Sequence, residues 1–266
     1  MSNSGSISFT SYQDIQEGLL SWRRWILLGW YDFSLRYRRT AIGPLWQALQ
    51  LAIWVGGLAI VFHDRFGEKS EIYIPYLASG MALWNYMASS LTDGCHVFSR
   101  NRSIINNINT PITLHVYRFL TTAVIRMAYQ FLVFLCIIPF FPVPFGWQTL
   151  WVIPGLLVMI FTSVWVVLLM GIIGTRFRDT SFAIASVMRF MFFITPIFWF
   201  AESMGDRALI ATLNPFAHFM DIVRSPILGT EPSMMSWLVV LGITFTGFVV
   251  TLFSFHKVRP AIVFWL

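Results

Sequence analysis

Two arginines lie inside long apolar stretches of this sequence, where a positive charge is costly. Arg126 and Arg189 each lie about seven or eight residues, roughly 11 Å, from one end of an expected membrane span. At that depth a guanidinium can reach the nearer membrane interface with its long side chain. Alternatively, Arg189 faces a central cavity and binds an anionic group, such as a phosphate or an acidic sugar. The sequence leaves open whether these arginines face a channel or the interface.

Aromatic side chains gather next to Arg189, between residues 192 and 200 and around Pro196. The flat face of an aromatic ring stacks on the C–H surface of a sugar without requiring fixed hydrogen bonds. A pore that must pass a long glycan without gripping it would suit such a lining. Any single one of these aromatic residues fits an interface belt or a lipid-facing position equally well. The candidate lining residues are Arg189, Phe192, Phe193, Pro196 and Trp199.

Motifs for enzymatic chemistry are absent from this sequence. It contains no H-E-x-x-H, no G-x-S-x-G and no Cys/His cluster at metal-ligand spacing. It also lacks the phosphate-binding G-x-x-x-x-G-K-[ST] loop, so we do not expect this chain to hydrolyse ATP by itself. His96, His115 and His218 are scattered, and Asp179 has no evident partner. We therefore predict no catalytic residue, no metal site and no cofactor in this chain.

The composition is that of a membrane protein. Of the 266 residues, 57% are hydrophobic and 11% are charged, whereas about a quarter of a soluble domain is charged. Residues 1–18 show no apolar core after a basic start, so we expect no cleavable signal peptide. Cys95 and Cys136 lie in or beside different apolar stretches, which argues against a disulfide framework. The net charge of +6 is better explained by basic cytoplasmic loops than by binding of nucleic acid.

Six apolar runs are long enough to cross a membrane, at about 20 residues for each helix. Small and polar residues such as Ser79 and Asn85 dilute the second run, but they are common where membrane helices pack together. We therefore predict an all-α integral membrane protein with six transmembrane helices in residues 45–266. The expected spans are 45–63, 74–91, 119–141, 150–174, 181–200 and 236–255.

The placement of charges orients these spans. With the amino terminus inside, twelve of the 18 basic residues lie in cytoplasmic segments and four lie in outer loops. The positive-inside rule then puts both termini in the cytoplasm. The cytoplasmic twelve are Arg23, Arg24, Arg36, Arg38, Arg39, Arg100, Arg102, Arg118, Arg176, Arg178, Lys257 and Arg259, and the outer four are Arg65, Lys69, Arg207 and Arg224.

Residues 1–44 are expected to form a cytoplasmic amino-terminal segment with an amphipathic helix. Apolar residues recur there at spacings of three or four, while Arg23, Arg24 and Asp32 lie largely off the apolar face. Such a helix lies in the membrane interface rather than crossing the membrane. Whether it does more than anchor the chain stays open. The apolar face comprises Ile15, Leu19, Trp22, Ile26, Trp30 and Phe33.

Two segments between spans contain short helical patterns. In the basic loop 92–118, the run Ile104–Pro111 predicts a short helix that ends before the proline and is either a docking helix or a simple connector. In the outer stretch 201–235, Asn214-Pro215 is a turn signal between two short amphipathic pieces. These pieces either re-enter the membrane, which would indicate a pore mouth, or lie on its outer face.

Several short motifs resemble the permease subunits of bacterial ABC exporters of polysaccharides. The run Tyr31–Trp46, YDFSLRYRRTAIGPLW, is similar to the step by which a basic interfacial helix turns into that family's first span. The run RFRD at residues 176–179 looks like the family's short basic loop between the fourth and fifth spans. The run TPIFW at residues 195–199, and Asn214-Pro215 followed nine residues later by Arg224, continue the resemblance. The loop that ends in Thr110-Pro111 occupies the place of the family's first coupling helix.

The resemblance implies a homodimeric permease that works with two copies of a separate ABC ATPase subunit, which would bind ATP and Mg²⁺. The dimer would enclose a channel for lipid-linked O-antigen, capsular polysaccharide or a teichoic-acid-like polymer in the inner membrane of a bacterium. The implied residues are Arg36, Arg38 and Arg39 at a cytoplasmic entrance that attracts lipid pyrophosphate; Arg100, Arg102, Ile104, Ile105, Asn106, Asn107, Thr110, Pro111, Arg178 and Asp179 in coupling to the ATPase; and Asn214, Pro215, Phe216 and Phe219 in an outer gate.

Two other functions stay open at this point. One is an ABC permease for another cargo, such as a drug or a lipid. The other is a membrane enzyme acting on lipid-linked sugars, which is disfavoured because it would need a cluster of carboxylates or histidines. The identity of the sugar repeat and of the lipid carrier does not follow from the sequence.

Overall fold

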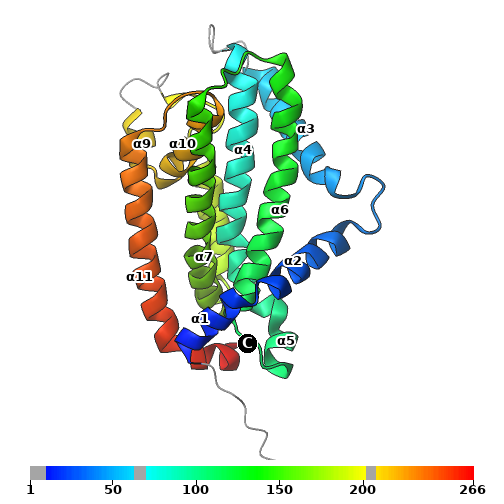
Figure 1. Cartoon of the computed structure of the whole chain (residues 1–266), viewed down its shortest axis with the longest axis vertical. Coiled ribbons are helices and arrows are strands. Elements are labelled where there is room, and N and C mark those ends of the chain that lie inside the picture. The colour runs from blue at the N-terminus through cyan, green and yellow to red at the C-terminus, as the bar shows by residue number, and fades with distance from the viewer. Residues whose placement is uncertain (1–9, 63–69, 202–207) are drawn as a thin grey trace, which may run out of the picture.

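Helices make up the regular structure in a computed structural model that describes residues 10–62, 70–201 and 208–266 (Figure 1). The predicted all-α class is confirmed, since these ranges contain α-helices and 3-10 turns and no strand. The α-helices are α1 Ser11–Leu20, α2 Trp22–Tyr37, α3 Trp46–Phe62, α4 Ser70–Thr92, α5 Arg102–Asn107, α6 Thr113–Ile137, α7 Val152–Arg176, α8 Thr180–Ile194, α9 Ala208–Leu213, α10 Pro215–Ile227 and α11 Met234–Trp265. The 3-10 turns are η1 Gly43–Leu45, η3 Gly94–His96, η4 Ser99–Asn101, η5 Ile138–Phe140 and η6 Trp147–Trp151.

Four stretches of helix are long and apolar enough to cross a membrane, namely Gly43–Phe62, Thr113–Phe140, Trp147–Arg176 and Met234–Trp265. They contain α3, α6, α7 and α11, so the chain is a multi-pass α-helical membrane protein. The predicted second and fifth spans correspond to α4 and α8, which are not among the four. Helix α8 has 15 residues, fewer than the roughly 20 that a perpendicular span needs.

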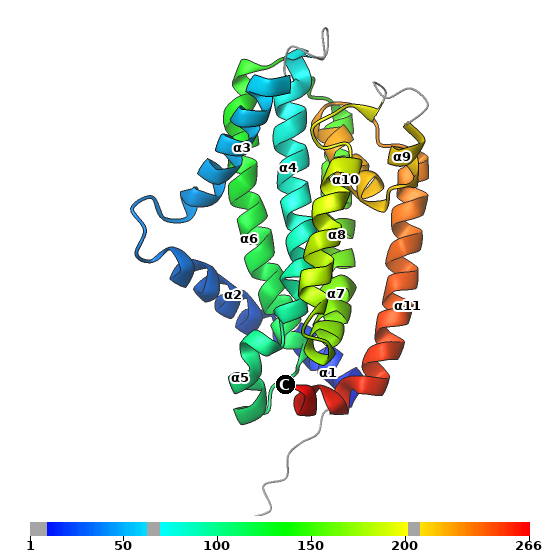
Figure 2. The ribbon, with the colours of Figure 1, turned by 180° about the vertical axis from the view of Figure 1, so that it is seen from behind.

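Helix α4 lies in the middle of the bundle (Figures 1 and 2). Every described side chain from Tyr73 to Ser90 is buried or half-buried, and α3, α6, α7, α8 and α10 all contact this helix. Its serine hydroxyls at residues 79, 89 and 90 bond within the helix, as Ser79 Oγ donates to the carbonyl of Pro75 at 2.8 Å. Because its neighbours are protein rather than lipid, α4 tolerates the polar residues that make its sequence the least apolar of the predicted spans.

The predicted limits of the fifth span are wrong at its carboxyl end. The helix was expected to reach Phe200, but α8 ends at Ile194 and Thr195 has extended backbone, with φ −81° and ψ 136°. Pro196 is the reason, because a proline disfavours helical geometry in the residue before it. Residues 195–200 therefore continue as non-helical chain.

The limits of two other spans also differ from prediction. Helix α6 begins at Thr113 rather than Phe119. Helix α11 continues to Trp265 rather than Phe255 and runs through Pro260. Its last turns hold together despite the proline because Ile262 is fully buried against the bundle.

The predicted amphipathic segment is two helices, with a break at Ser21 between α1 and α2. Its predicted apolar face is divided, since Trp22, Ile26 and Trp30 are 52%, 40% and 52% exposed, whereas Phe33 is 1% exposed and packs on the bundle. An apolar face directed outward is what an interfacial helix presents to lipid. The residues that face the bundle instead are Asp14, Gly18, Gly29, Phe33 and Tyr37.

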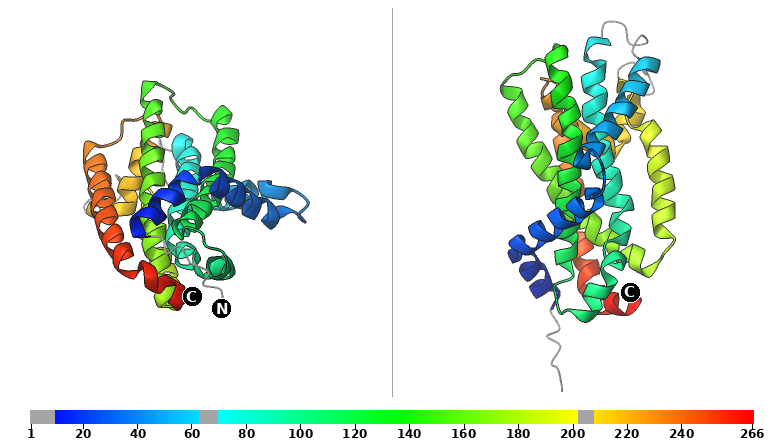
Figure 3. Two further views of the ribbon diagram at one scale, coloured as in Figure 1. Left: turned by 60° about the horizontal axis from the view of Figure 1, so that its bottom comes forward. Right: turned by 90° about the vertical axis from the view of Figure 1, so that its right-hand side faces the viewer.

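The two ends of the bundle carry different elements. Helices α1 and α5 and the carboxyl end of α11 lie at one end, and α9 and α10 lie at the other (Figures 1 and 2). Between α2 and α3 the chain forms an elbow, residues 38–45, that projects from the side of the bundle (Figure 3). Gly43 permits this turn because its φ of +57° lies in the left-handed region that favours glycine.

Candidate functional site

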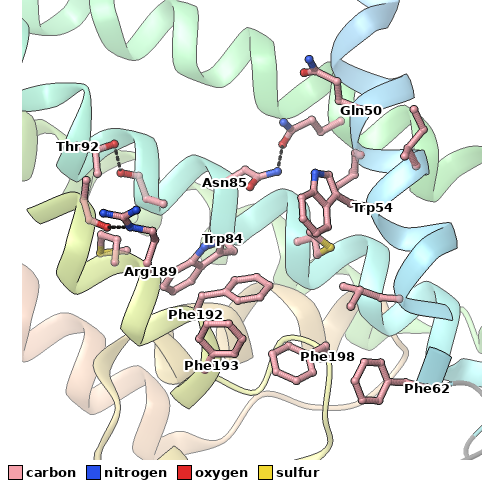
Figure 4. Close-up of a pocket in the computed structure, with 18 residues that line it drawn as sticks. Gln50, Trp54, Phe62, Trp84, Asn85, Thr92, Arg189, Phe192, Phe193 and Phe198 are labelled. Atoms are coloured by element: carbon pink, nitrogen blue, oxygen red, sulfur yellow. Dashed lines mark hydrogen bonds between the residues drawn. The ribbon is translucent and has the colours of Figure 1, made fainter. Parts of the chain in front are cut away.

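A groove of about 1270 Å³ runs along the bundle between α3, α4 and α8 (Figure 4). Its walls are mostly aromatic and aliphatic, with Trp54 from α3, Trp84 from α4 and Phe192 from α8. Trp84 and Phe192 meet edge to face with ring centroids 5.8 Å apart, a geometry that aromatic rings favour. The groove is open along one side, since Trp54 and Phe193 are 65% and 66% exposed.

The groove has a polar end and an apolar end. Thr92 and Arg189 lie at one end, and Phe62 and Phe198 lie at the other (Figure 4). The guanidinium of Arg189 donates only within α8, to the carbonyl of Ala185 at 3.3 Å and to Ser186 Oγ at 3.2 Å. No carboxylate in the described part of the chain pairs with Arg189, so its positive charge is available to the groove.

The five predicted lining residues divide into two groups. Arg189, Phe192 and Phe193 line the groove. Pro196 and Trp199 are buried outside it, and Trp199 Nε1 donates to the carbonyl of Phe193 at 3.1 Å. These two residues belong instead to the non-helical chain that follows α8.

Side chains from other helices satisfy the carbonyl groups of this non-helical chain. Tyr76 Oη on α4 donates to the carbonyls of Pro196 at 2.8 Å and Trp199 at 2.9 Å. Tyr73, also on α4, donates to the carbonyl of Phe198 at 3.0 Å. Irregular backbone among transmembrane helices requires such protein partners, because lipid offers none.

Two of the sequence motifs meet at this same place. Asn214 is 5% exposed and donates through Nδ2 to Thr195 Oγ1 at 2.8 Å. Arg224 on α10 is 8% exposed, donates to the carbonyl of Pro196 at 2.6 Å and lies 3.9 Å from the centroid of the Tyr76 ring. The TPIFW run and the Asn-Pro…Arg pattern are therefore two halves of one contact between the end of α8 and α10.

The predicted outer gate residues lie at the start of α10. Asn214 caps this helix by accepting the N–H of Phe216 at 3.0 Å, and Pro215 is its first residue. Phe219 is 8% exposed, and the ring of Phe216 lies 5.5 Å from that of Trp84. Helix α10 thus packs into the bundle rather than on its surface, which favours the re-entrant interpretation over an interfacial loop.

The predicted coupling residues lie at the opposite end. Arg102, Ile104, Ile105, Asn106 and Asn107 lie in α5, which ends before Thr110 and Pro111 as the sequence predicts. Asn106 and Asn107 are exposed, whereas Ile104 and Ile105 are half-buried. Arg100 precedes α5 and pairs with Asp93 at 3.3 Å. Arg178 and Asp179 are exposed in the turn between α7 and α8, at the same end (Figure 2).

The predicted entrance arginines lie at the elbow. Arg36 is in the last turn of α2, and Arg38 and Arg39 follow it. All three side chains are exposed. The three arginines therefore lie between the last turn of α2 and the start of α3, in a different part of the chain from α5.

Sequence reasoning missed the buried carboxylate of Asp14. It accepts the backbone N–H groups of Ile112 at 3.1 Å and Thr113 at 3.0 Å, and it pairs with Arg259 at 2.8 Å. Asp14 therefore caps α6 from α1 and ties both to α11. No local signal pointed to this role, because the sequence placed the start of this span at Phe119, and only the structure shows that α6 begins at Thr113 after Ile112, whose side chain cannot cap a helix.

Two further arginines have acidic partners. Arg118 on α6 makes a bidentate pair with Asp32 on α2, at 2.5 and 2.6 Å. Arg126, also on α6, lies 3.5 Å from Asp93 at the end of α4, and its side chain is 15% exposed. Arg126 thus points towards Asp93 at the end of α4.

Comparison with known proteins identifies the family. Residues 23–228 match the family described as "ABC-2 type transporter". The chain belongs to the ABC-2 type transporter family. Two proteins of Klebsiella pneumoniae named "O-antigen export system permease protein RfbA" are similar to it, one 23% identical over 245 residues and the other 25% identical over 248 residues. Each comparison covers 86% of this chain and 89% of the relative.

The family match covers the described structural features from α2 to α10. It contains the elbow, the groove and the contact between α8 and α10, while α1 and α11 lie outside it. The resemblance to polysaccharide-exporter permeases, expected from short motifs, is confirmed by the family match and by the similarity to these two O-antigen export permeases.

Proposed function

We propose that this chain is the permease subunit of an ATP-driven exporter that moves lipid-linked polysaccharide across the inner membrane of a bacterium. The observation that carries the proposal is the large, open and mostly apolar groove, with aromatic side chains in its walls, in a chain of the ABC-2 family. Aromatic walls suit a polymer that must slide, since they contact sugar faces without fixed hydrogen bonds. The similarity to two O-antigen export permeases supports this class of cargo.

Two copies of the chain would form the channel. In one copy the groove is open along one side, and the rim of this opening carries exposed apolar side chains such as Ile53, Trp54 and Phe193. A second copy facing this rim would cover it and enclose the groove. The Arg189 charge would then face the interior of the channel near its polar end.

The proposed orientation rests on the basic residues and on the ends of the bundle. Helix α5 and the end of α11 lie at the same end and carry the exposed Arg102 and Lys257, which supports both termini in the cytoplasm. In this arrangement α4 and α8 complete six membrane passages, α8 together with the non-helical chain 195–200. Helices α9 and α10 lie at the outer end, where they form the gate.

A separate ABC ATPase would supply the energy and would bind ATP and Mg²⁺. Two copies of it would dock on the two permease subunits. Asn106 and Asn107 on α5 and the exposed Arg178-Asp179 turn form the surface for this contact. The exposed Arg36, Arg38 and Arg39 at the elbow would attract the pyrophosphate of the lipid carrier from the cytoplasmic side.

Deletion of the gene tests the proposal. We expect a lipid-linked glycan to accumulate on the cytoplasmic side, identified by extraction and mass spectrometry. Re-expression of this chain should clear the glycan. If no glycan accumulates and sensitivity to a drug appears instead, the cargo is of another class and the polysaccharide proposal fails.

A further inference from the structure

A second, smaller cavity of about 90 Å³ lies beside the groove, between α3, α4 and α6. Gln47, Asn85, Ser89, Arg126 and Gln130 line it with amide, hydroxyl and guanidinium groups. By the same measure one water needs roughly 10–15 Å³, so the cavity has room for a group of several atoms. Asn85 and Gln130 line the groove as well, so the cavity adjoins the groove.

The charge of Arg126 is only partly compensated. Its distance to Asp93 is 3.5 Å, whereas charge-assisted bonds between N–H and carboxylate are usually about 2.7–2.9 Å. Asp93 is also shared with Arg100, at 3.3 Å. By contrast, Arg118 and Arg259 meet their carboxylates at 2.5 and 2.8 Å. Arg126 is therefore a mostly buried cation with spare capacity for an anion.

The amides around Arg126 are held loosely. Gln130 Nε2 donates to Gln47 Oε1 at 3.3 Å, and Asn85 Nδ2 donates to Gln130 Oε1 at 3.5 Å, both long for hydrogen bonds. An incoming phosphate oxygen, which accepts more strongly than an amide oxygen, can replace these contacts. The site thus offers one cation and several nearby N–H donors.

The cavity also connects to the elbow. Gln47 Nε2 donates to Tyr37 Oη at 2.5 Å, and Tyr37 is the residue after Arg36. The elbow is therefore joined to the cavity through Tyr37 and Gln47, and the cavity adjoins the groove.

We infer that the Arg126 cavity binds a phosphate or diphosphate group carried on a lipid, and holds it where the lipid-linked cargo reaches the groove. This inference rests on the proposed function, for which it supplies a loading site. A phosphate on an isoprenoid carrier and the headgroup of an anionic phospholipid share this chemistry.

Binding to the purified full-length chain tests the inference. The chain would be placed in phosphatidylcholine nanodiscs, and equilibrium binding of radiolabelled farnesyl diphosphate would be compared with that of farnesol. We expect Arg126→Gln to weaken binding of the diphosphate about tenfold or more, and Arg126→Lys to restore most of it. Arg24→Gln removes an exposed arginine from α2 and should leave binding unchanged. Diphosphate binding that is equal in the wild type and in Arg126→Gln would overturn the inference.

Two further variants separate binding from a structural role of Arg126. Asp93→Asn removes its carboxylate partner, so diphosphate binding should stay equal or become tighter; a loss as large as in Arg126→Gln would mean that Arg126 only holds α6 to α4. Gln130→Leu keeps the charge pair and removes an amide, so it should weaken binding several-fold. If Arg126→Gln does not fold, unchanged binding in Gln130→Leu overturns the inference in its place.

A change in the nanodisc lipids distinguishes the two sources of the phosphate group, an isoprenoid carrier and a phospholipid headgroup. Competition by phosphatidylglycerol in the nanodisc would assign the site to phospholipid headgroups, and continued binding of farnesyl diphosphate would assign it to an isoprenoid carrier. If the Arg126 cavity does not bind the diphosphate, deletion of the gene should still cause glycan to accumulate. A deletion without glycan accumulation would instead refute the proposed exporter function.

Discussion

The arginines in the described part of the chain differ in how their charge is compensated. Arg118 and Arg259 have close carboxylate partners, and Arg224 has a carbonyl and an aromatic ring. Arg189 has only atoms of its own helix. A buried charge needs partners, so the first three hold helices together, while Arg189 leaves its charge open to the groove.

Replacement of Arg189 tests whether that charge acts on cargo. We expect Arg189→Ala to slow export of an anionic polysaccharide several-fold, because the channel would lose its attraction for the polymer at the polar end. The measurement is the rate at which labelled glycan appears on the cell surface. Arg24→Ala, which removes an exposed arginine outside the groove, should export normally. Normal export by a stably inserted Arg189→Ala protein would contradict the expectation.

Replacement of Arg224 tests the contact between α8 and α10. We expect Arg224→Met to lower the free energy of unfolding by about 1.5–3 kcal/mol, because the Pro196 carbonyl loses a bond to a charged donor. Thermal unfolding of the purified protein measures this change. Arg178→Met, at an exposed position, is the matched control and should unfold as the wild type does. Equal stability of the two variants would show that the contact contributes little.

At the scale of elements, the carboxyl end of α8 determines how the groove and α10 are arranged. Pro196 ends the helix. The side chains of Tyr73, Tyr76 and Arg224 then donate hydrogen bonds to backbone carbonyls of the non-helical chain that follows. The rings at residues 192, 193 and 198 pack against one another. The proline break thus keeps the aromatic end of the groove compact, and α10 is fixed to it through Asn214.

Helix α5 is expected to act as a separable element. Its six residues expose Asn106 and Asn107 at the end of the bundle, so a bulky charge there should block the ATPase without disturbing the bundle. We expect Asn106→Arg to abolish copurification with the ATPase and to lower export at least several-fold. Glu231→Arg, exposed at the opposite end, should copurify normally. Undiminished copurification by Asn106→Arg would place the contact elsewhere.

At the scale of the whole molecule, the bundle has its least apolar predicted span, α4, at its centre and two chemically different ends. Helix α4 is surrounded by other helices, and its described side chains include no large exposed apolar residue, whereas helices such as α3, α7 and α11 expose several. Basic residues gather at the end that carries α5. This arrangement fits a lipid-embedded bundle whose basic end faces the cytoplasm.

The orientation is tested by labelling single cysteines in intact cells. Cys136 is exposed and would be replaced by serine, whereas Cys95 is buried. In that background a membrane-impermeant maleimide should label Glu231→Cys in intact cells, and Asn107→Cys only after permeabilisation. The reverse pattern would invert the topology.

Much of the architecture could be predicted from sequence, because hydropathy and charge act locally. The apolar runs predicted α3, α7 and the core of α11, and the proline at residue 111 predicted a short helix before it. The carboxyl end of α8 could have been predicted from Pro196. The prediction was wrong because the apolar run continues past this proline to Phe200. The lining roles of Arg189, Phe192 and Phe193 agree with the groove, but nothing local distinguishes them from the buried Pro196 and Trp199.

The sequence by itself determined the class of the protein, the number of its apolar runs and the bias of its charges, since each is a sum over neighbouring residues. Only the tertiary structure decided which polar groups meet. Asp14 caps α6 and pairs with Arg259, and Arg224 donates to the carbonyl of Pro196, across separations of 98, 245 and 28 residues. Such pairings depend on how helices pack, and no single stretch of chain encodes them. The same packing makes Arg126, a costly charge in the sequence, the centre of a candidate anion site.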